Sequence, residues 1–239
     1  MTLLACRNKL VSMANALLIL GNQLFDPTHK SLKDLKIDRV FMREDIELCT
    51  HFKYHKQKIA LFLMAMRSYA EELRAKKFEV DYQELEFSDL PYEAHFTKWL
   101  SKNKITHVSL FEIEDKFFET RIFEALKKSG VEVNVLQSPM FLTSRTQFKA
   151  YLGKYKRPFM RTFYEQQRKR LKIMVDERDE PIGGKWSFDE LNRKPLPKNI
   201  EPPEPNLAPN TKHLEAVRTI CEKHFADHPG NLESVWFAT

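Results

Sequence analysis

Ala16-Leu17-Leu18-Ile19-Leu20-Gly21-Asn22-Gln23-Leu24 is the stretch that decides the fold. Its five consecutive apolar residues end at a glycine and are too few for a helix, so they predict a β-strand. A strand that is apolar on both faces is typical of a parallel sheet, because helices cover both sides of such a sheet. Ligands of these sheets bind beyond the carboxyl ends of the central strands, so we expect a site near Gly21, Asn22 and Gln23.

Strand and helix patterns alternate from this stretch to residue 136. Apolar residues within 54–76 recur every three or four positions, as in a helix with one buried face. Gly130 follows the last helical pattern and is a typical helix end. The alternation predicts an α/β fold with a doubly wound, five-stranded parallel sheet of the Rossmann-like type. The expected strands are 16–20, 37–42, 78–82, 107–111 and 131–136, and the expected helices are 54–76, 93–102 and 118–128.

The character of the chain changes near Thr143. Two helices, 144–152 and 158–174, are expected first, and seven of the twelve prolines then fall between Pro181 and Pro209, which indicates an extended connector. A last helix is expected at 211–225. The expected organisation is an α/β domain at 14–142, basic helices packing on it at 143–176, a connector at 177–210, and the truncated start of a further helical domain at 211–239.

Composition is that of a folded globular protein. The 239 residues are 42% hydrophobic and 30% charged, which argues against intrinsic disorder. Cys6, Cys49 and Cys221 lie far apart without a CxxC motif, which excludes a cysteine zinc site and favours free thiols in the cytoplasm. No apolar run approaches the roughly 18 residues that a membrane-spanning helix needs, so no membrane partner is expected.

A basic run is the clearest charged feature. Residues 145–172 carry ten Lys or Arg and one acid, with six aromatic residues between them. Cations of this kind bind nucleic-acid phosphates, and the rings can stack on bases. The alternative is that rings at helical spacing pack internally while the cations face water. The candidate nucleic-acid-binding residues are Arg157, Arg161, Arg168, Lys169 and Arg170.

Acidic residues follow two of the expected strands. Because the carboxyl ends of parallel strands meet at one edge, these acids and Asn22 can line one crevice and orient a heterocycle by hydrogen bonds. The alternative is that they are ordinary solvated loop charges. The acids are Glu44, Asp45, Glu47, Glu112 and Glu114.

Several chemistries are disfavoured by the motifs that the chain lacks. His51 and His55 are four residues apart, but no carboxylate or cysteine lies at metal-ligand spacing, so no metal is expected. The sequence has no GxSxG nucleophile motif, and Gly183-Gly184 lacks the lysine of a phosphate loop. The loop after the first strand has no HxGH-type histidine, which disfavours ATP chemistry. No catalytic residue is expected in this chain.

Four blocks of sequence form a recognisable set. They are Leu18-Ile19-Leu20-Gly21-Asn22-Gln23-Leu24; His55-Lys56-Gln57-Lys58-Ile59-Ala60 with 65–67 and 70–74; Phe141-Leu142 with Met160-Arg161-x-Phe163-Tyr164 and Arg168-Lys169-Arg170; and Gly183-Gly184-Lys185-Trp186-x-Phe188-Asp189-x-x-Asn192-Arg193-Lys194-Pro195. In these blocks the chain resembles the deoxyribodipyrimidine photolyase-related proteins, which are the iron–sulfur bacterial cryptochromes and prokaryotic (6-4) photolyases. The resemblance runs from about residue 14 to residue 239.

The resemblance implies the N-terminal antenna-chromophore domain of a light-dependent DNA photolyase or cryptochrome. In the family, a second helical domain holds FAD and a four-cysteine 4Fe–4S cluster. Three scattered cysteines cannot supply that cluster, so we expect FAD and the cluster only in a C-terminal half that this chain lacks. Full-length members repair (6-4) photoproducts in damaged DNA, and we expect this chain to be inactive alone.

The antenna of this family is a lumazine bound at the strand ends. The chain departs from the family pattern at three positions, since Asn22 replaces a common aspartate, Leu48 a glutamate and Phe62 a smaller aliphatic residue. The pocket is expected to hold a lumazine, to hold another ring system or to be empty. The implied cofactor-binding residues are Gly21, Asn22, Gln23, Glu44, Glu47, Leu48, Phe62, Glu112 and Glu114.

Two other functions stay open at this point. One is a light-independent nucleic-acid-binding module that uses the surface of residues 145–172. The other is a partner-interaction module, which the apolar Trp236 and Phe237 near the end of the chain favour.

Overall fold

The computed structural model describes residues 14–85, 88, 90–155, 157–201, 203 and 212–233. The chain forms two compact units, the first made of Met1–Pro139 with Leu207–Thr239 and the second of Met140–Asn206. The expectations for Cys6, Trp236 and Phe237 lie outside the described residues. The expected packing of the basic helices on the α/β domain stays a prediction.

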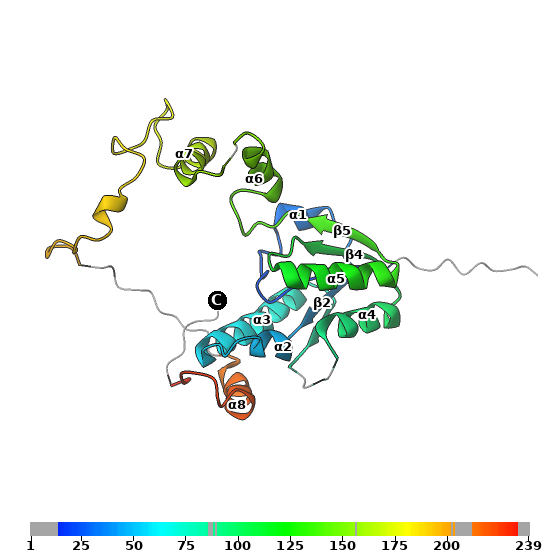
Figure 1. Ribbon diagram of the computed structural model, residues 1–239. Coiled ribbons are helices and arrows are strands. Elements are labelled where there is room, and N and C mark those ends of the chain that lie inside the picture. Colours follow the sequence, from blue (N-terminus) through cyan, green and yellow to red (C-terminus); the bar gives the residue numbers. More distant parts are fainter. Residues whose placement is uncertain are drawn as a thin grey trace, which may run out of the picture. The chain divides into compact units, whose positions relative to one another are not determined.

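The first unit is built on a sheet of five parallel strands (Figure 1). The strands are β1 (Ala14–Leu18), β2 (Arg39–Arg43), β3 (Val80–Gln83), β4 (Ile105–Phe111) and β5 (Glu132–Leu136). Their order is β3-β2-β1-β4-β5, so the chain adds β2 and β3 on one side of β1 and then crosses to its other side. The switch point therefore lies between β1 and β4. The expected doubly wound α/β fold is confirmed.

The decisive stretch forms the central strand, with shifted bounds. β1 begins and ends two residues earlier than the expected 16–20, although the Ile19 amide still donates to the Phe41 carbonyl at 3.1 Å. Ile19 and Leu20 fall outside the assigned strand, and the chain turns at Gly21 just after them. Side chains alternate between two core clusters, one containing Ala16, Leu18 and Leu20 and the other Leu17 and Ile19.

Helices cover both faces of the sheet (Figure 1). On one face α4 and α5 pack through aromatic and aliphatic side chains such as Phe96 and Ile122, and on the other α3 packs through Met66, Tyr69 and Leu73. None of the helices in the described ranges combines the length and apolar character needed to cross a bilayer. The helices of this unit are α1 (Lys30–Lys33), α2 (Ile46–Thr50), α3 (Lys56–Ala75), α4 (Tyr92–Lys102), α5 (Lys116–Ser129) and α8 (Leu214–His224).

The opposite face of α3 is buried by α8. Leu63 of α3 and Val217 and Cys221 of α8 belong to one core cluster. Beyond α8 the chain runs back along the start of α3, where the Lys56 amide donates to the Pro229 carbonyl at 2.9 Å. Cys49 and Cys221 are free thiols, as expected, and burial raises the pKa of Cys221 to about 11.

Local signals explain most helix ends. Gly130 caps α5 in the left-handed conformation with φ of 67°, as its sequence position predicts. The short α2 is absent from the expectations, because a single turn has no periodicity and depends on Asp45, whose side chain accepts the Leu48 amide at 3.1 Å.

The second unit contains α6 (Arg145–Leu152), α7 (Met160–Leu171) and a 3-10 turn, η1 (Asp189–Leu191). Ser144 and Gln147 form a capping box at the start of α6. The rings of Tyr151 and Phe163 meet at 5.0 Å between centroids and join the two helices. The expected helix 158–174 is too long, because Lys172 adopts a left-handed conformation with φ of 55° that ends α7.

Candidate functional site

A cavity of about 280 Å³, here called the strand-end pocket, lies at the carboxyl ends of β1, β2 and β4. Doubly wound sheets bind ligands at this edge, beside the switch point. The volume is just below the range of about 300–1,000 Å³ of most small-molecule sites, so the pocket suits a small fused ring and not a dinucleotide. Its lining includes Leu20, Gly21, Asn22, Arg43, Glu44, Asp45, Leu48, Phe62, Met66, Tyr92, Ile113 and Phe118.

The walls of the pocket are largely apolar, although the charged residues Lys58 and Asp115 also line it. Leu48 of α2 and Phe62 of α3 are 47% and 39% exposed, so both present apolar surface that the fold leaves uncovered. A flat aromatic ligand would cover it. A Cβ at Gly21 would lie 2.7 Å from Sδ of Met66, so a larger residue there would displace the Met66 side chain.

Glu44 borders the pocket but is used by the fold. One of its carboxylate oxygens accepts hydrogen bonds from Nε of Arg67 at 2.7 Å and from the Tyr82 hydroxyl. The other accepts from Nη2 of Arg67 at 3.0 Å and from the Leu85 amide at 2.8 Å. Burial and the Glu44 charge raise the pKa of Tyr82, so its phenol stays a donor. Glu44 therefore joins β2 to α3 and to the segment after β3, with its acceptor capacity filled.

Asp45 and Tyr92 both line the pocket with polar side chains and are here called its polar floor. Asp45 is 6% exposed, and burial raises the pKa of its carboxyl group. Tyr92 begins α4, and burial raises the pKa of its phenol. The sequence predicted Asp45 as one of the acids of the crevice but gave no indication of Tyr92. Tyr92 begins α4, and no local pattern links it to β2, which ends at Arg43 far earlier in the chain.

Four of the expected cofactor-binding residues lie outside the pocket lining. Gln23 is buried, and its Nε2 donates to the Glu112 carbonyl at 2.8 Å and to Glu114 at 3.3 Å. These three residues join the loops after β1 and β4 to each other. Glu47 instead forms an ion pair with Arg121 of α5 at 2.8 Å. The structure thus brings together Gly21, Asn22, Glu44, Leu48 and Phe62 of the expected set.

The two histidines considered as metal ligands have structural places. His51 ends α2, and Nδ1 of His55 accepts the Gln57 amide at 3.2 Å, which caps α3. Within the described ranges, no three His, Cys, Asp or Glu side chains gather in a way that could hold a metal ion.

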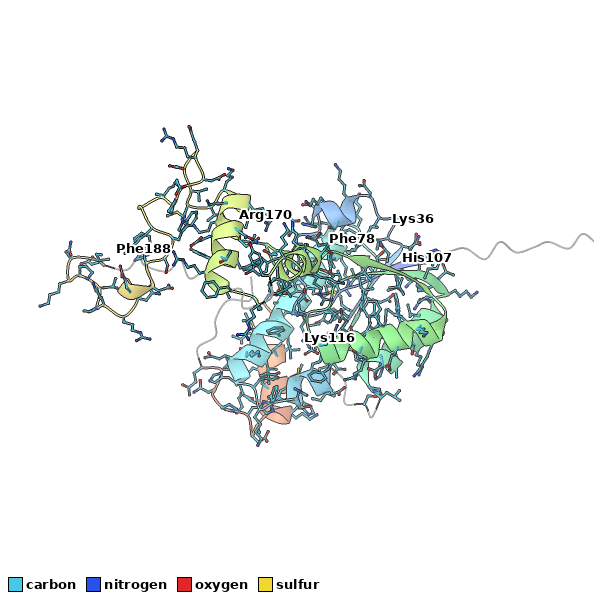
Figure 2. The ribbon with its side chains drawn as sticks, turned by 45° about the horizontal axis from the view of Figure 1, so that its top comes forward. Lys36, Phe78, His107, Lys116, Arg170 and Phe188 are labelled. Atoms are coloured by element: carbon cyan, nitrogen blue, oxygen red, sulfur yellow. The ribbon has the colours of Figure 1, made fainter. Side chains whose placement is uncertain are left out.

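The candidate nucleic-acid-binding residues of the second unit separate into two groups. Arg157, Arg161, Lys169 and Arg170 are exposed, and Figure 2 labels Arg170 on α7. Arg168 is buried, and its guanidinium donates to the backbone carbonyls of Ile173, Met174 and Trp186. Arg168 therefore holds the segment after α7 in place and is not part of the exposed surface.

A second cavity, of about 970 Å³, lies wholly within the second unit, along α7 and residues 174–192. Phe159 and Tyr164 line it from α7 and its start, and Trp186 and Phe188 line it from the following segment, where Figure 2 labels Phe188. Nζ of Lys169 lies 5.1 Å from the centroid of the Trp186 ring. Lys169 itself does not line the cavity, but Arg161 and Lys185 do, so this groove contains both rings and cations.

Sequence similarity to known proteins covers most of the chain. The sequence profile of the deoxyribodipyrimidine photo-lyase-related proteins matches residues 17–237. The chain belongs to this family. Its expected resemblance is thereby confirmed.

Two relatives of this photolyase-related chain differ in length. A (6-4) photolyase of Agrobacterium fabrum is 28% identical over 231 residues, which are 95% of this chain and 45% of that protein. An uncharacterised protein of Acanthamoeba polyphaga mimivirus is 27% identical over 197 residues, which are 79% of this chain and 98% of that protein. The chain thus spans about half the length of the photolyase and nearly all of the viral protein.

Proposed function

We propose that the first unit of this photolyase-related chain is an antenna-chromophore domain that binds a lumazine in the strand-end pocket. The observation that supports it best is the pocket itself, which combines apolar walls with a polar floor beside the switch point. A lumazine has two apolar ring faces, which the apolar walls would contact, and a polar edge, which the polar floor would bind. Leu48 and Phe62 would contact the ring faces, while Gly21 and Asn22 would close the pocket at the end of β1.

The rest of the proposed mechanism belongs to the complete photoreceptor or photolyase. In the complete protein, Gly21, Asn22, Leu48 and Phe62 would hold the lumazine, which would supply light energy to an FAD in a helical partner domain. That FAD would supply the electron-transfer chemistry for the repair of a (6-4) photoproduct. The relationship to a (6-4) photolyase over 95% of this chain supports this assignment. Damaged DNA is therefore the proposed substrate of the whole protein, and this chain is proposed not to repair it alone.

Lumazine binding is tested by the fluorescence anisotropy of a lumazine during titration with the purified chain. We expect the anisotropy to rise and an absorption band of the bound ring to appear. Leu48→Ala should weaken binding by about fivefold, because roughly half of a leucine side chain would be covered by the ligand. Leu90→Ala is the matched control, since Leu90 is 49% exposed and does not line the pocket. A wild-type chain that leaves the anisotropy unchanged would contradict the antenna function.

A second candidate function is light-independent nucleic-acid binding by the second unit. The exposed Arg157, Arg161, Lys169 and Arg170 favour it, as does the aromatic groove along α7. Rings such as Trp186 and Phe188 provide stacking surfaces that accept any base. Phosphate contacts by the exposed cations would make this binding strongly dependent on salt.

A further inference from the structure

One buried polar group at the strand-end pocket has no function within the fold. Tyr92 is 1% exposed, and its ring packs edge-on against Phe41 and Phe118 at centroid distances of 6.2 and 5.1 Å. Its hydroxyl makes no hydrogen bond to any part of the chain that the structure describes, although the residue borders the pocket. A buried hydroxyl without a partner lowers stability, and phenylalanine would fill the same space without that cost.

Asp45 borders the same floor with an acceptor. One of its carboxylate oxygens caps α2 by accepting the Leu48 amide, and the Glu47 amide and the Arg43 cation also interact with this carboxylate. Burial, and then the nearby Asp45 charge, raise the pKa of Tyr92, so the phenol keeps its proton and is available as a donor. Glu44, the other acid at this strand end, has four internal hydrogen bonds and offers nothing further. The lining of one pocket therefore includes a neutral O–H donor, from Tyr92, and a carboxylate acceptor, from Asp45.

We propose that Tyr92 and Asp45 are the specificity-determining residues of the strand-end pocket and bind the imide edge of a fused pyrimidinedione ring. The Tyr92 hydroxyl donates to a ring carbonyl, and the Asp45 carboxylate accepts the adjacent ring N–H. The inference rests on the proposed antenna function and deepens it by naming the edge of the ligand that is recognised. Fused rings whose imide N–H is replaced by N–CH₃ should bind more weakly, because the methyl group would face a buried carboxylate.

The test compares Tyr92→Phe with Tyr69→Phe. Tyr69 is a matched control because its hydroxyl donates to the Phe25 carbonyl and the residue does not line the pocket. Without ligand, Tyr92→Phe should unfold at the wild-type temperature or above it, whereas Tyr69→Phe should unfold at a lower temperature. With a lumazine, Tyr92→Phe should raise the Kd about tenfold, and Tyr69→Phe should leave it unchanged. A lumazine methylated at the imide nitrogen should bind the wild type at least about tenfold more weakly than the parent ring.

The outcomes separate the two proposals. If the wild type binds a lumazine and Tyr92→Phe binds it equally well, the role of Tyr92 is wrong while the antenna function stands. If the methylated lumazine binds as tightly as the parent ring, the role of Asp45 is wrong. If ligand-free Tyr92→Phe loses as much stability as Tyr69→Phe, its hydroxyl has a partner within the fold and the inference fails. A wild type that binds no lumazine overturns both proposals.

Discussion

The carboxylate of Asp45 is buried, and its negative charge is unfavourable in the folded protein. Burial raises the pKa of its carboxyl group above the ordinary value of 3.8, so the folded chain binds this proton more tightly than the unfolded chain does. The contribution of such a group to stability is full below the unfolded pKa and is lost as the pH rises through the folded pKa. At neutral pH, the buried carboxylate therefore lowers the stability of the ligand-free protein.

Asp45→Asn should consequently raise the unfolding temperature at pH 7. Asparagine caps a helix about as well as aspartate does, so α2 is retained while the buried charge is removed. The gain should shrink as the pH falls toward 4, because the wild-type carboxyl group then becomes neutral as well. Thermal unfolding of both proteins between pH 4 and pH 7 measures the difference.

Asp26→Asn is the control of opposite sign. Asp26 is exposed, and hydrogen bonds from the Thr28 amide and hydroxyl lower the pKa of its carboxyl group. Its contribution to stability is present at neutral pH and is lost as the pH falls, so this variant should be slightly less stable at pH 7. A fall in stability of Asp45→Asn at pH 7 would contradict the assigned cost of the buried charge.

The residues of the site show where sequence reasoning stops. Glycine and asparagine after an apolar strand predicted the place of the pocket, because the carboxyl ends of parallel strands bind ligands. The same reasoning predicted that Glu44 binds the ligand, but its carboxylate accepts hydrogen bonds from the guanidinium of Arg67. Arg67 lies on α3, and only the packing of the core determines which face of α3 points toward Glu44. Tyr92 reaches the pocket in the same way, through tertiary packing that leaves no local pattern.

In the segment after α8, the backbone at Gly230 lies very close to the His55 ring at the start of α3. Gly230 has φ of 80°, and a Cβ there would lie 1.9 Å from Nε2 of His55, which caps α3. Gly130 also has a positive φ, of 67°, but a Cβ at that position would meet nothing within 4 Å. An alanine at Gly130 would therefore cause backbone strain alone, whereas an alanine at Gly230 would cause the same strain and a steric clash.

Gly130→Ala should lower the free energy of unfolding by about 1–2 kcal/mol, the cost of a left-handed alanine. Gly230→Ala carries the same backbone cost and also displaces the His55 ring, so its loss should exceed that of Gly130→Ala by about 1 kcal/mol, the value of a helix cap. Urea unfolding of the two variants measures both losses. Equal losses would mean that the contact between Gly230 and His55 contributes nothing to the α3 terminus.

Long periodic elements were predictable, and short ones were not. The apolar pattern in 54–76 predicted both ends of α3 within a few residues. In a helix of twenty residues, a few positions that break the pattern do not hide its period. The end of α7 was placed too late, since a lysine at position 172 carries no signal for the left-handed conformation that it adopts.

The exposed cations of the second unit predict a salt-dependent interaction of the chain with DNA. If Arg157 and Lys169 each contact a DNA phosphate, their joint replacement by alanine should reduce the slope of log K against log salt by about two. The measurement is the binding of the whole chain to plain duplex DNA at several salt concentrations.

A pair of exposed lysines on α5, Lys127 and Lys128, provides the matched control. Their replacement by alanine removes the same net charge from the first unit and should leave most of the slope intact. Equal effects of the two double variants would show that the DNA responds to net charge alone, and the surface of the second unit would then have no special role.

The strand order also determines when the sheet can be completed on the ribosome. Ala16 pairs with Arg39 on one side and with Val108 on the other, so the central strand has only one neighbour until β4 has been synthesised. Pairings between distant residues form slowly, and unpaired apolar strands are prone to aggregation. During that interval the nascent chain exposes the edge of its most apolar strand. We therefore expect the nascent chain to stay prone to aggregation until β4 has emerged.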